Sequence, residues 1–409
     1  MAGAKEIGPP MQESQLIWDR KHFSMKKVMT IPRSPRQYQA LTCAILASVI
    51  TCYSADKHAA GRTMMDNMDD WRVEHYCGNP RSRGFLQGPI NESAVNGSMA
   101  FDSKGNAYLS AGTSIRMITT DGKAVLIAGT PGLQGSTDGP GWKSTFAAAG
   151  NIVSASDDTF YVSDRVNFNI RKLERKADGT WHISTVAGTA GKTGHKDGTG
   201  NQALFSAPFN GLVYTDGILY AMDANWLRKI ENGIVTTLNA GTGYVNGPLK
   251  DARFKRAMGG GGCLTTNGKG NLYVADRWNQ AIRKVDLRKK EVTTYAGVLP
   301  GKKWGGPHDG SAFEARFHPG GGPCGNTFNK KHSFLLVQAA DEGGRIRIIK
   351  DGWVKTFFAP NKRKKGKISI GPLSKVTLDG GVCGIDPAGN IYISKGGRIR
   401  VIRYSRKKK

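Results

Sequence analysis

After about residue 80 the 409-residue sequence has no long stretch with the 3.6-residue hydrophobic repeat of an amphipathic helix, which excludes a helical bundle. It has instead 54 glycines between many short apolar runs, a composition typical of strands and turns. Nothing resembles the nucleophile elbow of the α/β-hydrolases, so no Ser-His-Asp arrangement is predicted.

Acidic residues are scarce: 32 Asp and Glu stand against 59 Lys and Arg, which gives a net charge of +27. Basic clusters at 361–367 and 406–409 carry part of this excess. Such a balance favours nucleic acid, anionic polysaccharide or an acidic membrane surface as a partner. The alternative is a solvated basic surface without a specific anionic partner.

The N-terminal region carries a pattern typical of a secretory signal. Basic residues after Met25 precede an uncharged apolar run at 40–50 and small residues at 54–55. We therefore predict an N-terminal extension and signal over 1–55, with Met25 as an alternative start, and a linker over 56–70. The protein is expected to be exported, without a stable membrane span after signal removal, because the apolar run is short. An uncleaved anchor and a lipoprotein at Cys52 are the alternatives.

The remaining sequence repeats one pattern, which is clearest at 271–297. Two short strands flank a turn over 276–279, a third apolar run ends in Ala-Gly, and a fourth candidate strand precedes them. An aromatic or apolar marker in the second strand recurs about every 53–63 residues, the period of a β-propeller blade. The markers are Tyr108, Tyr161, Tyr220, Tyr273, Leu336 and Tyr392. The sequence thus predicts an all-β fold, a six-bladed propeller of four-stranded blades over 71–409.

The last unit lacks a final strand, since few residues follow the run at 399–403. A copy of the missing strand stands before the first unit, at 71–78. We predict that this N-terminal strand completes the last blade and closes the ring, which removes an exposed sheet edge.

These units resemble the NHL repeat. The resemblance rests on Val-Ala-Gly at 186–188, Asp-Gly at 197–198, Leu-Tyr-Val-Ala-Asp at 272–276 and Ile-Arg-Lys at 282–284. It implies a propeller that acts mainly as an interaction platform, with enzymes as a minority of the family. It also implies that the Asp-Gly loops and the Asp-x-x-Asn turns share one rim, where Asp and Asn are expected to cap turns.

The implied rim carries arginine, aromatic and histidine side chains suited to stacking and to pairing with anions. The alternative is that the aromatic residues only fill loops between blades. The candidate binding residues are Arg165, Phe168, Trp226, Arg277, Trp278, Trp304 and His308.

Four of the six cysteines follow the N-terminal segment, and three of them, Cys263, Cys324 and Cys383, come after glycine-rich runs. If these runs begin the innermost strands, three thiols approach the central channel and offer a weak candidate site for zinc or copper. The alternatives are a disulfide, with Cys77 as the fourth thiol, or small buried residues in crowded strands.

The sequence therefore predicts an exported, monomeric binding platform for a protein or an anionic polysaccharide, acting through one rim. No cofactor and no catalytic residue is predicted. One alternative is an exported lactonase-like or amidating-lyase-like enzyme with calcium or zinc in the channel, for which His195, His308 and His318 are the candidate histidines. The other is nucleic-acid binding, which the charge favours and export disfavours.

Overall fold

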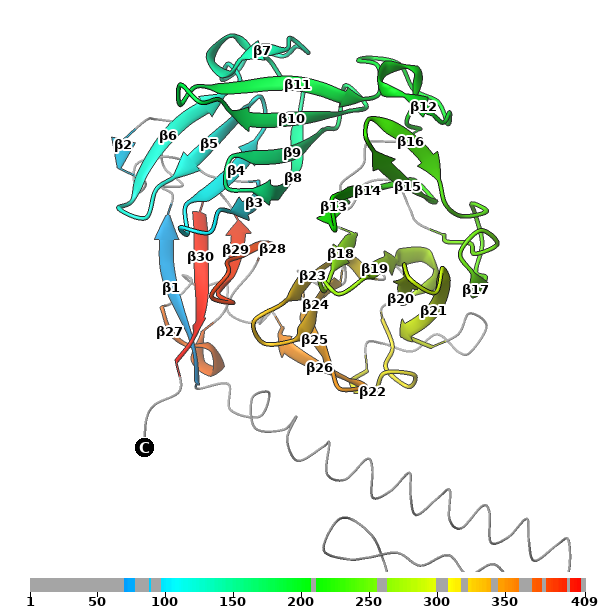
Figure 1. The fold of residues 1–409 in the computed structure, drawn as a ribbon. Coiled ribbons are helices and arrows are strands. Elements are labelled where there is room, and N and C mark those ends of the chain that lie inside the picture. Colours follow the sequence, from blue (N-terminus) through cyan, green and yellow to red (C-terminus); the bar gives the residue numbers. More distant parts are fainter. Residues whose placement is uncertain are drawn as a thin grey trace, which may run out of the picture. The chain divides into compact units, whose positions relative to one another are not determined.

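The computed structural model describes residues 70–77, 88–89, 97–206, 211–255, 263–298, 308–317, 323–339, 345–359, 370–376, 380–395 and 398–405. Within these residues six antiparallel sheets of five strands form the blades of a propeller (Figure 1). The predicted signal and the linker up to residue 69 lie outside the described residues. None of the helices in the described part is long and apolar enough to cross a membrane.

From the channel outward, blade 1 contains β3 (Ser98–Phe101), β4 (Ala107–Ala111), β5 (Ser114–Ile118), β6 (Lys123–Ala128) and β2 (Gly88–Pro89). Blade 2 contains β8 (Ala149–Ser156), β9 (Thr159–Asp164), β10 (Asn169–Arg175), β11 (Trp181–Ala187) and β7 (Gly139–Pro140). Blade 3 contains β13 (Leu212–Thr215), β14 (Ile218–Asp223), β15 (Trp226–Glu231), β16 (Ile234–Thr237) and β12 (Gly198–Thr199).

Blade 4 contains β18 (Leu264–Thr266), β19 (Asn271–Asp276), β20 (Ala281–Asp286), β21 (Glu291–Ala296) and β17 (Gly247–Pro248). Blade 5 contains β23 (Pro323–Asn329), β24 (Phe334–Ala339), β25 (Ile346–Lys350), β26 (Trp353–Phe358) and β22 (Gly310–Ser311). Blade 6 contains β28 (Gly381–Ile385), β29 (Ile391–Lys395), β30 (Arg398–Tyr404), β1 (Trp71–Cys77) and β27 (Gly371–Pro372).

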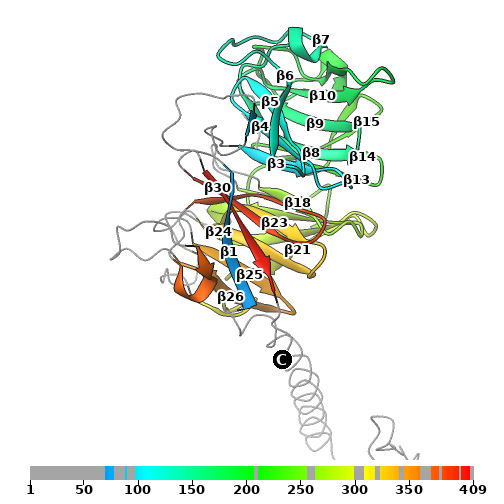
Figure 2. The ribbon, with the colours of Figure 1, turned by 90° about the vertical axis from the view of Figure 1, so that its left-hand side faces the viewer.

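The closing strand lies where the sequence predicts it. β1 pairs with β30 of the last blade, with Trp71 opposite Tyr404 and Val73 opposite Ile402. Both views show the blue β1 alongside the red β30 (Figures 1 and 2). The inner strands of neighbouring blades also contact each other all the way around, including β28 and β3. The six-bladed all-β fold and its closure by an N-terminal strand are therefore confirmed.

Each blade has one strand more than the four predicted. A two-residue strand from the loop that precedes the inner strand pairs with the outer long strand, as Gly139 does with Ile183 in blade 2. Gly139 has φ of +125°, a conformation that a side chain disfavours. The Asp-Gly dipeptides therefore mark edge strands, which the sequence analysis assigned to loops.

A buried arginine explains why three sequence features repeat together. In blade 2, Arg171 donates from Nη2 to Asp138 Oδ1 (2.7 Å) and from Nη1 to the Thr145 carbonyl oxygen (3.0 Å). Its Cζ lies 5.0 Å from the ring centre of Phe146. Asp138 also accepts from the amide of Thr185 on the outer strand (2.8 Å). A buried guanidinium needs such partners, so the Asp-Gly dipeptide, the phenylalanine that follows it and the Ile-Arg pair form one interaction set.

The same set recurs in three further blades. Arg228 binds Asp197 above Phe205, Arg283 binds Asn246 above Phe254, and Arg347 binds Asp309 above Phe317. Blades 1 and 6 keep buried arginines, Arg116 and Arg400, although Gln87 and Ile370 replace the aspartate in their sequences. The arginine is thus the more constant member of the set.

Candidate functional site

The inner strands of all six blades surround a channel with a volume of about 1120 Å³. Pockets that bind small ligands in proteins typically measure about 300–1,000 Å³, so the channel can take a ligand or a protruding group of a larger partner. We call the end where the inner strands begin, near Gly97 and Ala149, the N-terminal mouth. The end where they finish, near Asp386, is the C-terminal mouth.

The charged side chains that line the channel are mainly cationic. Among the described residues, Arg165 lines the N-terminal mouth, while Lys330, Lys331 and Asp386 line the C-terminal mouth. The Asp386 carboxylate accepts from the backbone amide of Asn390 (2.8 Å), from its Nδ2 (2.7 Å) and from the Tyr392 hydroxyl (3.0 Å). The Asp386 carboxylate is therefore hydrogen-bonded within blade 6, and the three cations outnumber it, which leaves an excess of positive charge to attract an anion.

Arg165 reaches the channel from the turn between β9 and β10. This turn is fixed to the start of the inner strand, because Arg165 N donates to the Ala148 carbonyl oxygen (2.9 Å) and Asp164 accepts from the Ala147 and Ala148 amides (3.1 and 2.8 Å). The arginine stem then crosses β8 at Gly150. The local fold thus delivers a guanidinium to the mouth from a well-anchored turn.

Hydrogen bonds between neighbouring blades hold the wall of the same mouth. Asn151 Nδ2 donates to Ser98 Oγ of blade 1 (3.0 Å), and Asn151 Oδ1 accepts from the Leu212 amide of blade 3 (2.8 Å). Ser110 Oγ donates to the Gly150 carbonyl oxygen. One amide side chain therefore connects three blades at the place where Arg165 enters.

The other predicted rim residues that the structure describes are spread over blades 2 to 5 and do not line the channel. Phe168 adopts a left-handed conformation, with φ of +55°, in the same turn as Arg165. Arg277 and Trp278 belong to η6 (Arg277–Asn279) of blade 4, where the Trp278 side chain is 54% exposed. Asn279 Nδ2 donates to Asp276 Oδ2 (2.8 Å) and so bridges the two ends of this turn, but Asp276 forms no side-chain cap on η6. Arg165 is thus the predicted residue that the structure places in the channel.

His195 and His308, two of the candidate histidines for an enzyme site, mainly make contacts within their own blades. The exposed His308 forms a β-bridge with Arg316, and its carbonyl oxygen accepts from Arg347. His195 stacks on Trp226, with ring centres 4.0 Å apart.

Trp304 and His318 lie outside the described residues. Trp142, an aromatic residue of η4 (Gly141–Lys143), is 69% exposed at the outer edge of blade 2.

The environment of His195 leads to a pH prediction. Burial, and then the Arg228 charge, lower the pKa of His195 below its ordinary 6.5. Below pH 6.5 the unfolded chain therefore binds a proton that the folded protein resists, and stability is lost as pH falls towards the folded pKa. We expect the unfolding free energy of the wild type to fall more between pH 7.5 and 5 than that of His195→Gln, measured by urea denaturation. Parallel curves for the two proteins would contradict the assignment.

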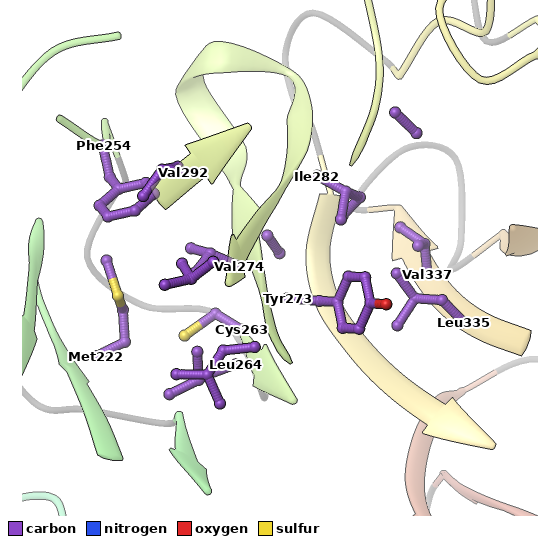
Figure 3. Packing of buried hydrophobic residues seen from close by; sticks show 14 of the residues in the cluster. Met222, Phe254, Cys263, Leu264, Tyr273, Val274, Ile282, Val292, Leu335 and Val337 are labelled. Carbon is purple, nitrogen blue, oxygen red and sulfur yellow. The ribbon is translucent and has the colours of Figure 1, made fainter. Parts of the chain in front are cut away.

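The cysteine candidates do not gather in the channel. Cys263 is buried in the core between blades 3 and 4, where its sulfur lies among Met222, Leu264 and Val274 (Figure 3). Cys383 lines the channel, with its Sγ 3.5 Å from Met99 Sδ. The side chain of Cys324 lies outside the described residues. Cys263 therefore has the role of a small core residue, the alternative given for these cysteines, and it brings no thiol to the channel as the weak metal candidate required.

Cys77 and Cys383 are unpaired thiols in the structure. Burial raises the pKa of the Cys77 thiol to about 12, so this thiol is not poised to become a nucleophile. Across the part of the chain that the structure describes, no three His, Cys, Asp or Glu side chains lie together as a metal site requires.

Lys330, Lys331, Gln338 and the role of Gly150 were not predicted from the sequence. The signal for Gln338 and for the role of Gly150 was the glycine near the start of an inner strand. Gln338 crosses Gly381 as Arg165 crosses Gly150: a Cβ at Gly381 would lie 2.9 Å from its Oε1. In these two blades a glycine near the start of the inner strand therefore marks where a side chain from another strand or turn enters the channel.

No family model matches the sequence. One curated relative, the chloroplastic protein SUPPRESSOR OF QUENCHING 1 of Arabidopsis thaliana, is 28% identical over 141 residues. The match covers 32% of this chain and spans only 13% of the length of that protein.

Solved structures with a similar fold come from Bacteroides. An auxiliary nutrient binding protein of Bacteroides thetaiotaomicron has a TM-score of 0.55 at 17% identity, over 82% of this chain and 77% of its own. An auxiliary nutrient binding protein of Bacteroides ovatus has a TM-score of 0.55 at 13% identity, over 81% and 76%. At these identities the likeness concerns the fold alone. By fold, then, the chain is a six-bladed β-propeller similar to these Bacteroides proteins.

Proposed function

We propose that the protein is an exported binding propeller of NHL type that recognises an acidic polysaccharide through its central channel and through the rim of turns around the N-terminal mouth. The observation that carries the proposal is the charge of the channel: among the described lining residues three cations, Arg165, Lys330 and Lys331, outnumber the single carboxylate of Asp386. A channel lined by one sign of charge concentrates the opposite sign and speeds its association.

The rim adds features suited to a sugar chain. The exposed Trp278 beside Arg277 presents an aromatic face and a cation in the same turn. Aromatic faces pack against the apolar faces of sugar rings, while arginine pairs with their carboxylates. The two Bacteroides proteins of similar fold are nutrient binding proteins by name, which agrees with a role in binding but, at their low identity, does not identify a ligand.

We expect polygalacturonate to bind the protein at about 0.15 M salt and a neutral galactan not to bind. Lys330→Ala/Lys331→Ala is expected to weaken the binding of polygalacturonate about tenfold, because two cations leave the channel. Isothermal titration calorimetry measures both affinities.

The matched control is Lys143→Ala/Lys250→Ala, which removes the same charge from two exposed lysines on the outer edges of blades 2 and 4. It should change the affinity less than twofold. Equal losses in the two double variants would mean that the excess positive charge attracts polyanions without a site, and the proposal would then be wrong.

A further inference from the structure

We propose that Arg165 is a carboxylate-binding residue, whose guanidinium at the N-terminal mouth pairs with one carboxylate of the bound partner. The inference rests on the proposed function and deepens it by naming the recognised group and the residue that recognises it.

The path depends on the absence of a side chain at residue 150. A Cβ on Gly150 would lie 2.6 Å from Cδ and 2.7 Å from Cγ of Arg165, and 2.8 Å from Ser163 Oγ. These separations are shorter than carbon atoms tolerate, so any other residue would displace the arginine stem. Gly150 therefore forms the cradle in which Arg165 lies as it enters the channel.

The guanidinium group of Arg165 has fewer hydrogen-bond partners than that of Arg171 in the same blade. Arg171 is saturated by Asp138 and by two carbonyl oxygens. Among the described residues no carboxylate forms an ion pair with Arg165, and its buried Nε has no hydrogen-bond partner. Asp164, the nearest acid in sequence, is fully buried and accepts from backbone amides and Asn167. The Arg165 fork is thus available to a ligand.

The surroundings favour a polar, planar anion. Ser98, Ser110, Gln338 and Ser394 line the same part of the channel, and within the described residues no acidic side chain lines this mouth. Gln338 reaches the wall across Gly381. A guanidinium matches a carboxylate with two parallel hydrogen bonds, whereas an ammonium group acts as a point charge. Replacing arginine by lysine therefore separates carboxylate recognition from simple charge attraction.

The experiment measures the binding of two carboxylate sources, trigalacturonate and a hexaglutamate peptide, by calorimetry on the full chain. For the wild type we expect binding of trigalacturonate, weaker binding of the peptide, and little competition by sulfate. Arg165→Gln is expected to weaken trigalacturonate binding at least 30-fold. Arg165→Lys, which keeps the charge, should still weaken it about tenfold. Gly150→Ala should resemble Arg165→Gln, because it displaces the side chain.

Arg175→Gln is the matched control: the same substitution in the same blade, at an exposed arginine that does not line the channel. Its affinity should equal that of the wild type. Because Arg165→Lys preserves the packing of the stem over Gly150, it also reports on the site if another variant unfolds. The folded state of every variant is checked by thermal denaturation.

The outcomes separate this inference from the proposed function. Binding that depends on Lys330 and Lys331 but not on Arg165 would overturn the inference and leave the proposed function intact. Equal affinity of Arg165→Lys and wild type, with full competition by sulfate, would show charge attraction alone and would also overturn it. A preference for the hexaglutamate peptide would keep the carboxylate anchor and replace the polysaccharide by an acidic protein. Failure of both probes to bind would refute both proposals.

Discussion

Trp71→Ala is expected to lower the free energy of unfolding by about 3–5 kcal/mol, the usual cost of removing a large buried aromatic side chain. Trp71 is 1% exposed although it is the first residue of β1. Its ring lies 5.2 Å from that of Phe357, 5.1 Å from that of Tyr404 and 5.9 Å from that of His332. Urea denaturation measures the loss.

The effect should be large because Trp71 anchors the strand that closes the ring. β1 pairs along its length with β30 on one side, whereas its other neighbour, β27, has two residues. Because the backbone pairing on that second side is so short, the side chains of β1 must supply much of its attachment. Its partners Phe334 and Phe357 belong to blade 5, and Trp71 therefore also joins the last blade to its neighbour. Losing the ring would loosen the strand and the blade interface together.

Trp142→Ala is the control, since the same substitution at a 69% exposed site should cost less than about 0.5 kcal/mol. A loss below about 1 kcal/mol for Trp71→Ala would show that backbone pairing alone holds β1 in the last blade. The closure would then owe little to the aromatic cluster.

The fold was predictable because the marker residue of the repeat packs against the neighbouring blade in more than one place. Tyr108 of blade 1 stacks on Phe160 of blade 2 at 3.9 Å, and Tyr273 of blade 4 stacks on Phe328 of blade 5 at 5.5 Å. The marker position therefore packs across blade interfaces in more than one blade. Because this packing requires an aromatic or apolar residue at the same position of each repeat, that residue type recurs periodically in the sequence.

The channel was less predictable because its residues are set by exceptions to the repeat. Lys330 and Lys331 follow an inner strand in one blade, and Gly150 and Gly381 accept side chains from other strands and turns. Whether Cys263 faces the channel or the core depends on register, because a shift of one residue reverses every side chain of a strand. Cys263 directly precedes β18 and packs into the core.

The buried arginine sets lead to the second large effect. Asp276→Ala is expected to lower the unfolding free energy by about 3–5 kcal/mol, because it leaves a buried guanidinium without its carboxylate. Asp276 Oδ2 accepts from Arg283 Nη1 (2.9 Å) and from Asn279 Nδ2 (2.8 Å), and Oδ1 accepts from the Lys255 amide (2.7 Å). Both members of the ion pair have fully buried side chains. Urea denaturation again measures the change.

A second arginine–carboxylate pair in the same protein is the control. Arg403 and Glu74 join β30 to β1 at 3.0 Å, but their side chains are 42% and 45% exposed. Glu74→Ala should therefore cost about 0–1 kcal/mol, since water replaces the lost partner. If burial is what makes the first pair important, Asp276→Leu/Arg283→Met should be more stable than Asp276→Ala, because no unpaired charge remains in the core. Equal costs for the exposed and the buried pair would mean that the Arg283 carbonyl contacts suffice to hold the rim turn that carries Trp278.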